Sequence, residues 1–159
     1  MRFSILPVAV CVAAACQGGS SPIQPDDLAS LRVVEGVRYE ADTRVMESFP
    51  VQLATAVTIT NTTSARITLH FRDGCIVTLR AYQGGQQVWD QRTLILCTQA
   101  LVDAVIEPGR SSVFEARTSA AEILAGGLPD GEYQLEAVLE PSGEVVRLGA
   151  GTVPLAIPR

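Results

Sequence analysis

The sequence contains no lysine and only one histidine and one tryptophan among its 159 residues. The single histidine, His70, falls on the polar side of an alternating segment, so a Ser-His-Asp or Cys-His arrangement would have to be built on a solvent-facing side chain. The sequence also lacks a phosphate-binding glycine loop, a dinucleotide fingerprint and the ligand spacing of a zinc site. These absences argue against an enzyme, and we expect neither a cofactor nor a metal.

Positive charge is sparse as well. The chain has 12 basic residues, all of them arginine, against 17 acidic ones, for a formal net charge of -5. The arginines are spread singly along the chain rather than clustered. An acidic chain without a basic patch is a poor partner for a phosphate backbone, so we expect no binding of nucleic acid.

The longest apolar run lies at the N-terminus, from Phe3 to Ala15, and it is shorter than the roughly 20 residues that span a bilayer. Arg2 precedes this run, and three alanines lead directly to Cys16. A positive start, an apolar core and small residues before a cleavage point are typical of a secretory signal. Because a cysteine follows at once, the segment resembles the signals of bacterial lipoproteins. We predict a signal peptide over 1–15 and a lipid on Cys16; the alternative is an ordinary signal with Cys16 as a bystander.

Residues 16–30 are rich in glycine, serine, proline and aspartate, which predicts a flexible, lipidated tether. Two or more acyl chains on Cys16 would hold a protein stably at a membrane, and this lipid is the only membrane contact that we expect. Gln17 follows the cysteine, where lipoproteins retained at the inner membrane carry aspartate. We therefore expect an exported chain anchored in the cell envelope, at the periplasmic face of the outer membrane where an organism has two membranes.

Two cysteines remain once the signal is removed and Cys16 is lipidated. Cys75 and Cys97 would then lie in an oxidising compartment, where disulfides persist, so we predict that they form one. A metal site is the weaker alternative, because two cysteines and one histidine do not supply four ligands. A tight hairpin at 84–85 would place Leu94 rather than Cys97 opposite Cys75, so a longer loop, a bulge or a contact between two sheets must bring the cysteines together.

Short alternating segments separated by turn residues fill the rest of the chain. Alternation with period two is clearest over 51–60, 67–71 and 132–139, which indicates strands with one buried face. The one helical segment is 119–125, where Ser119 and Glu122 have the spacing of a capping box. Further strands are predicted from about residue 31 and over 75–82, 87–90, 93–99, 102–106, 113–116, 145–148 and 152–157.

Many short strands at regular spacing predict an all-β chain that folds as an antiparallel β-sandwich. Asp130 and Gly131 before Tyr133 resemble the tyrosine corner of immunoglobulin-like sandwiches, in which the phenol bonds back to the preceding loop. The alternative is a buried tyrosine that simply opens a strand. We predict an immunoglobulin-like antiparallel β-sandwich over 31–159 with at most one short helix.

A set of motifs follows in fixed order through the middle of the chain. Over about residues 51–140, their order and spacing resemble the BsuPI-related intracellular proteinase inhibitor domain, a small immunoglobulin-like sandwich. The resemblance implies a domain that binds a serine protease without a cofactor and without turnover. The motifs are 57–63, 67–71 with Gly74, 85–89 with its Val-Trp pair, 98–101, 106–115 and 128–133.

An inhibitor that mimics a substrate needs an exposed, rigid loop. Arg72, beside the predicted disulfide, and Arg110, in the turn that follows Pro108, are the candidate loop contacts, although an ordinary surface turn is the simpler interpretation of both. We therefore expect a membrane-anchored proteinase inhibitor. The alternative is a binding or assembly module of the cell envelope that holds another envelope protein through a sheet edge or a loop.

Overall fold

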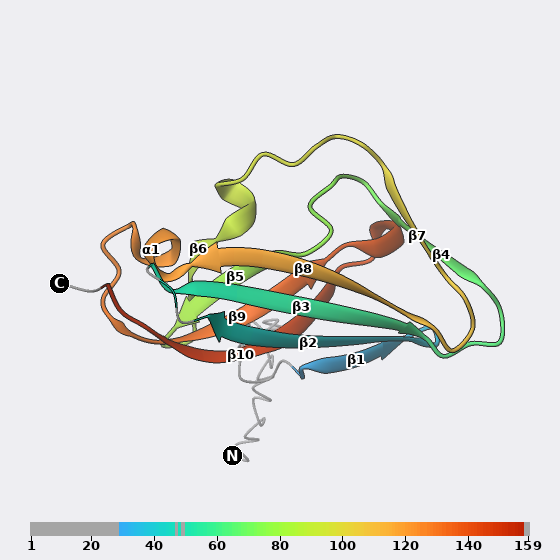
Figure 1. Ribbon diagram of the computed structural model, residues 1–159, viewed down its shortest axis with the longest axis horizontal. Helices are drawn as coiled ribbons and strands as arrows, with labels where there is room; N and C mark the ends of the chain where they lie inside the picture. Colours follow the sequence, from blue (N-terminus) through green and yellow to red (C-terminus); the bar gives the residue numbers. More distant parts are fainter. Residues whose placement is uncertain (1–28, 47, 49, 158–159) are drawn as a thin grey trace, which may run out of the picture.

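The computed structural model describes residues 29–46, 48 and 50–157, which form three antiparallel sheets (Figure 1). Two sheets have four strands each, in the orders β1-β2-β3-β8 and β10-β9-β5-β6, and the third is the pair β4-β7. The strands are β1 (Leu31–Val34), β2 (Val37–Met46), β3 (Gln52–Asn61), β4 (Ile67–Phe71), β5 (Thr78–Gln83), β6 (Gln86–Asp90), β7 (Val102–Ile106), β8 (Ser111–Ser119), β9 (Gly131–Leu139) and β10 (Val146–Leu155). One α-helix, α1 (Ala120–Leu124), and two 3-10 turns, η2 (Gln91–Thr93) and η3 (Pro141–Gly143), complete the described part.

Alternation in β3 follows the predicted pattern. Leu53, Val57 and Ile59 are fully buried, because they face the second sheet. Thr55 is buried in the same row, and its hydroxyl shares a 2.7 Å hydrogen bond with the hydroxyl of Thr43 on β2. This bond satisfies a polar group that would otherwise be costly to bury.

The two four-stranded sheets enclose one hydrophobic core, to which both contribute buried residues. At one end, the phenol of Tyr133 donates a 2.6 Å hydrogen bond to the carbonyl of Pro129, which confirms the predicted tyrosine corner. The described residues thus form an immunoglobulin-like antiparallel sandwich with one short helix. Within them, no helix has the length and apolar character needed to cross a membrane.

Helix α1 begins where the capping pattern predicts. The Ser119 hydroxyl accepts a hydrogen bond from the Glu122 N–H at 3.1 Å, and the Glu122 carboxylate accepts one from the Ser119 N–H at 3.0 Å. Two other predictions were wrong. The segments predicted over 145–148 and 152–157 lie mostly within the single strand β10, whose register shifts between Gly149 and Thr152. Segment 93–99 is not a strand, because the chain leaves the ladder after Asp90 and turns into η2.

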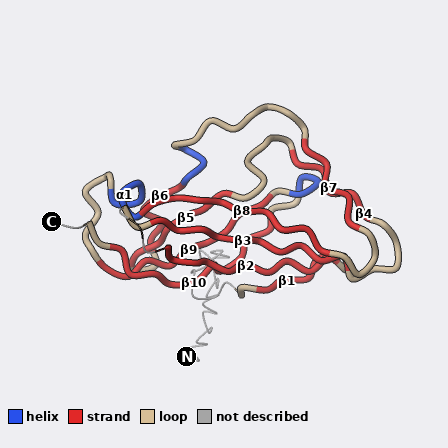
Figure 2. The backbone as a smooth tube through the Cα atoms, viewed as in Figure 1, coloured by secondary structure: helices blue, strands red, loops and turns tan. Residues whose placement is uncertain are grey.

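Two long connections link the pair β4-β7 to the sheet that contains β5 and β6. Residues 72–77 lead from β4 to β5, and residues 94–101 lead from η2 to β7. Figure 2 shows both as stretches without regular structure above the sandwich, the second forming its upper outline. These two connections carry the candidate site.

Candidate functional site

The connection over 94–101, called the contact loop below, exposes large apolar side chains. The exposed fractions are 64% for Leu94, 38% for Ile95, 102% for Leu96 and 81% for Leu101. A single exposed leucine is ordinary on a protein surface, but four such residues on one loop without helix or strand form an unusual apolar surface. The loop has no charged residue between Arg92 and Asp103.

The start of the contact loop is fixed by the buried side chain of Gln91. Its carbonyl oxygen accepts a 3.1 Å hydrogen bond from the N–H of Leu79 on β5, and its amide donates a 2.7 Å bond to the carbonyl of Arg117 on β8. One side chain therefore joins the two large sheets. The backbone carbonyl of Gln91 accepts hydrogen bonds from the N–H groups of Leu94 and Ile95, at 2.9 and 3.2 Å, so the chain is held through the first turn of the loop.

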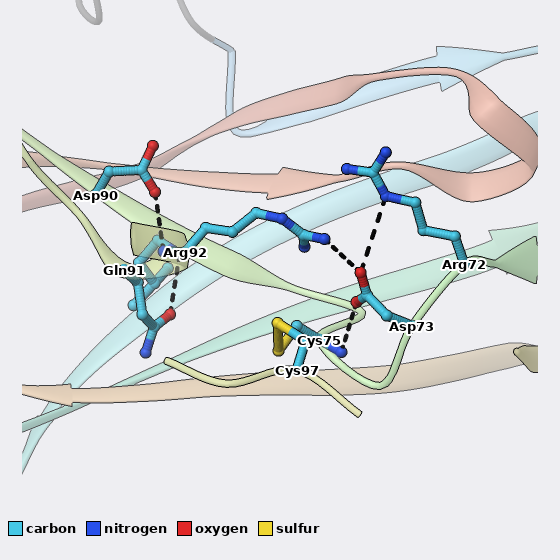
Figure 3. Close-up of a disulfide and its surroundings, with 8 residues drawn as sticks. Arg72, Asp73, Cys75, Asp90, Gln91, Arg92 and Cys97 are labelled. Carbon is cyan, nitrogen blue, oxygen red and sulfur yellow. Dashed lines mark hydrogen bonds and ion pairs between the residues drawn. A yellow bond between two sulfur atoms is a disulfide. The ribbon is translucent and has the colours of Figure 1, made fainter. Parts of the chain in front are cut away.

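An ion pair beside η2 ties the loop to the neighbouring connection (Figure 3). The Arg92 guanidinium donates to one oxygen of Asp73, while the other oxygen accepts the N–H of Cys75 at 2.9 Å. Burial would raise the pKa of the Asp73 carboxyl, but these hydrogen bonds and the charges of Arg92 and Arg72 outweigh burial and hold the pKa below its ordinary value. Asp73 is therefore a charged anchor at neutral pH.

The other end of the exposed run 94–96 is fixed by a covalent bond. Cys75 and Cys97 form a disulfide with Cα atoms 5.4 Å apart, as predicted (Figure 3). Next to it, the N–H of Gly74 donates a 3.0 Å hydrogen bond to the carbonyl of Thr98. A β-carbon at Gly74 would lie only 2.2 Å from the Thr98 hydroxyl oxygen, so a larger residue here would force the Thr98 side chain to move.

The register problem of this disulfide has a local solution. Arg80 pairs with Asp90 after a shift in the β5-β6 ladder, so continuing that ladder would put residue 95 opposite Cys75. Instead η2 compresses the chain, because a 3-10 turn rises roughly 2 Å per residue where a strand rises roughly 3.3 Å. Cys97 thus meets Cys75 between two loops, and not across the two large sheets.

The two arginines singled out from the sequence lie in different places. Arg72 is beside the disulfide, where its guanidinium pairs with Glu140 at 3.0 Å and lies 3.8 Å from Asp73. Arg110 is in the β7-β8 turn, where its N–H bonds the carbonyl of Glu107 at 3.0 Å. The structure therefore places Arg72 next to the contact loop and Arg110 in a separate turn.

A small open cavity of about 170 Å³ lies beneath the same connections. It is smaller than the roughly 300–1,000 Å³ of most small-molecule sites, and three of its arginines, Arg72, Arg80 and Arg92, pair with carboxylates of the same region. Asp73, Cys75 and Cys97 bring three potential ligand atoms within 4.8 Å of one another, but both sulfurs are consumed by the disulfide. The lining includes Arg72, Arg80, Arg92, Arg147 and Glu140.

Two further sequence predictions concern His70 and the N-terminal signal with Cys16. His70 is exposed and its ring Nδ1 lies 2.8 Å from an Asp103 oxygen, so it is a surface histidine paired with a carboxylate. Cys16 and the signal over 1–15 lie outside the described residues. Ala29 and Ser30, the last residues of the predicted tether, already bond the backbone of β10 and β2, at 3.2 and 2.9 Å.

Sequence reasoning missed the contact loop itself. The run Leu94-Ile95-Leu96 lies in segment 93–99, which the sequence predicts as a strand, and consecutive large apolar residues usually indicate burial. The available signal was the run's position between a polar Asp-Gln-Arg-Thr segment and a cysteine, where a ladder could not continue without breaking the disulfide geometry.

Among curated proteins, none matches the sequence. Three solved structures are similar to the chain at 14% identity: structural genomics target SoR45 (TM-score 0.41, 80% of this chain and 91% of that one), the ApaA protein of Bordetella pertussis (0.38, 83% and 98%) and the yeast GGA1 GAE domain (0.24, 79% and 96%). The BsuPI family, described as intracellular proteinase inhibitor, matches residues 39–144. The chain belongs to this family of non-catalytic, protease-binding domains.

Proposed function

We propose that this chain inhibits a serine protease of the cell envelope from a lipid anchor on Cys16. Membership of the proteinase inhibitor family supports protease binding, and the composition of residues 1–30 supports export and anchoring. The inhibitor acts by occupying the protease rather than by chemistry of its own.

The observation that carries this proposal is the contact loop. Inhibition without turnover needs a segment that is exposed enough to enter a protease cleft and rigid enough to lose little entropy on binding. Residues 94–96 meet the first requirement, and Gln91, Arg92 and Cys97 meet the second by fixing the chain on both sides.

The direction of the loop supports an anchored inhibitor. Figure 1 shows β1, where the described chain begins, along the lower edge of the sandwich, and the contact loop along the upper edge. A flexible tether of the length of residues 17–28 would have an average span of roughly 20 Å. A lipid at Cys16 would then keep the lower edge within about that distance of the bilayer, and the contact loop lies on the opposite edge of the sandwich.

The disulfide supports a location in an oxidising compartment outside the cytoplasm. Disulfides persist in exported proteins and are rare in reducing compartments, so the bond between Cys75 and Cys97 fits a location outside the cytoplasm. In this respect the chain would differ from the intracellular setting in the description of its family.

Two measurements test the proposal. The full chain, purified in detergent with its disulfide intact, is titrated against trypsin-like, chymotrypsin-like and subtilisin-like proteases, with Arg72→Ala and Arg110→Ala alongside. We expect stoichiometric inhibition of at least one class, with Arg110→Ala unchanged. Labelling of cells with a radioactive fatty acid should mark the wild type and not Cys16→Ser. Failure to inhibit any class would favour an envelope assembly module, which the exposed Leu31 and Val33 on edge strand β1 would suit.

A further inference from the structure

We infer that Leu96 is the side chain that fills the specificity pocket of the target, and that this target is a serine protease with a deep apolar pocket. The inference rests on the proposed inhibitor function and assigns its contact residue and the class of its partner.

Leu96 stands out by exposure and by position. At 102% it is as exposed as a leucine in an extended reference peptide, while its neighbour Cys97 is half-buried and bonded to Cys75. The Leu96 side chain is therefore exposed on a backbone that the neighbouring disulfide holds in place. A fully solvated leucine forgoes the favourable transfer to an apolar environment, and a protease pocket would supply that environment.

The other apolar residues of the loop are less suited to this role. The N–H groups of Leu94 and Ile95 donate hydrogen bonds to the backbone carbonyl of Gln91, so these residues belong to the turn that ends η2, and Ile95 is only 38% exposed. Leu101 directly precedes β7 and lies beyond the anchors at Cys97 and Thr98. Leu96 is the most exposed of the large apolar residues of the loop, and it lies between the turn that ends η2 and the disulfide.

The absence of charge on the loop selects the class of protease. A trypsin-like pocket carries a carboxylate at its base and needs a cation from its ligand. The contact loop offers none, since the nearest cation in sequence is Arg92, whose guanidinium is engaged by Asp73. A chymotrypsin-like or subtilisin-like pocket has apolar walls that fit a leucine.

The fixed ends of the loop explain how one side chain could support tight binding. Ordering a flexible loop on binding costs about 0.5–1.5 kcal/mol for each immobilised side chain. Here most of that ordering is already present in the unbound domain, because the buried Gln91 amide, the Arg92–Asp73 ion pair and the disulfide hold the neighbouring backbone. Most of the free energy gained by burying Leu96 would then appear as binding affinity, since little of it is offset by the cost of ordering the loop.

The test compares three loop variants in the full chain with its disulfide intact. Leu96→Ala should weaken inhibition of chymotrypsin-like and subtilisin-like enzymes at least tenfold, and Leu96→Arg should abolish it and confer inhibition of trypsin. Leu101→Ala should change inhibition less than threefold. Val113→Ala, which shortens an exposed apolar side chain on β8, serves as a control for general surface effects. Trp89 fluorescence verifies that each variant is folded.

Each result has a defined meaning. A gain of trypsin inhibition by Leu96→Arg would establish the assignment, since a misfolded variant cannot acquire a new specificity. If the wild type inhibits and both Leu96 variants inhibit equally well, or if only Leu101→Ala loses activity, the proposed function stands and Leu96 is the wrong residue. If the wild type inhibits no protease, the proposed function fails and the assignment fails with it.

Discussion

Removing the disulfide should destabilise the domain by an amount that the loop it closes predicts. Cys75 and Cys97 are 22 residues apart, and in the chain-entropy model a closed loop of that length stabilises the folded state by about 3 kcal/mol. Replacing both cysteines by alanine releases the loop in the unfolded chain without leaving a free thiol. The core is not touched, because both cysteines lie in connections outside the strands.

Urea unfolding followed through the fluorescence of Trp89 measures this effect. Trp89 is the single tryptophan, it is 9% exposed, and it lies on β6, inside the segment 75–97 that the disulfide closes. For a denaturant slope near 2 kcal/mol/M, the midpoint should fall by roughly 1.5 M. A midpoint within 0.3 M of the wild type at an unchanged slope would refute the entropic account. Such a result would mean that the unfolded chain is already restricted between the two positions.

Three further predictions concern single side chains. Asp73→Asn should lower the free energy of unfolding at pH 7, as measured by urea titration. The difference in free energy of unfolding between this variant and the wild type should disappear below about pH 4, because a carboxyl with a depressed pKa loses its stabilising contribution as pH falls through that pKa. Gln91→Ala should cost about 2–4 kcal/mol, because it leaves a buried N–H and a partly buried carbonyl unpaired, whereas Gln86→Ala at the exposed hairpin tip should cost almost nothing. Burial, then nearby acids, raises the pKa of Tyr39 to about 12, so thermal stability should be constant up to about pH 10 and fall from there toward pH 12.

Much of the sandwich could be predicted because strand alternation and turn chemistry are local. Thr55 interrupts the apolar row of β3 in the sequence but is buried with it, since a cross-strand hydroxyl on Thr43 satisfies it. The tyrosine corner was also visible, because Pro129 and Tyr133 are only four residues apart. In contrast, the sequence predicted two strands, over 145–148 and 152–157, where the structure has one strand with a register shift between Gly149 and Thr152.

The candidate site was harder to predict because its parts are distant in sequence. Pairing of the two cysteines followed from their number and compartment, but the role of Gln91 did not, since its partners on β5 and β8 come together only in the folded sandwich. The loop was hidden for a different reason. Large apolar residues normally predict burial, and the sequence alone does not show that the chain leaves the ladder at Asp90.

The structure separates what holds the contact loop from what the loop presents, and this separation can be measured. Gln91, Arg92 and Cys97 provide the anchors, and none of these interactions involves the side chain of Leu96. Since that side chain is fully exposed, Leu96→Arg should keep the urea midpoint of the wild type within an equivalent of about 0.5 kcal/mol, whatever it does to inhibition. A larger loss would mean that Leu96 packs against the fold in solution, and the loop would then be part of the domain's core rather than a surface offered to a protease.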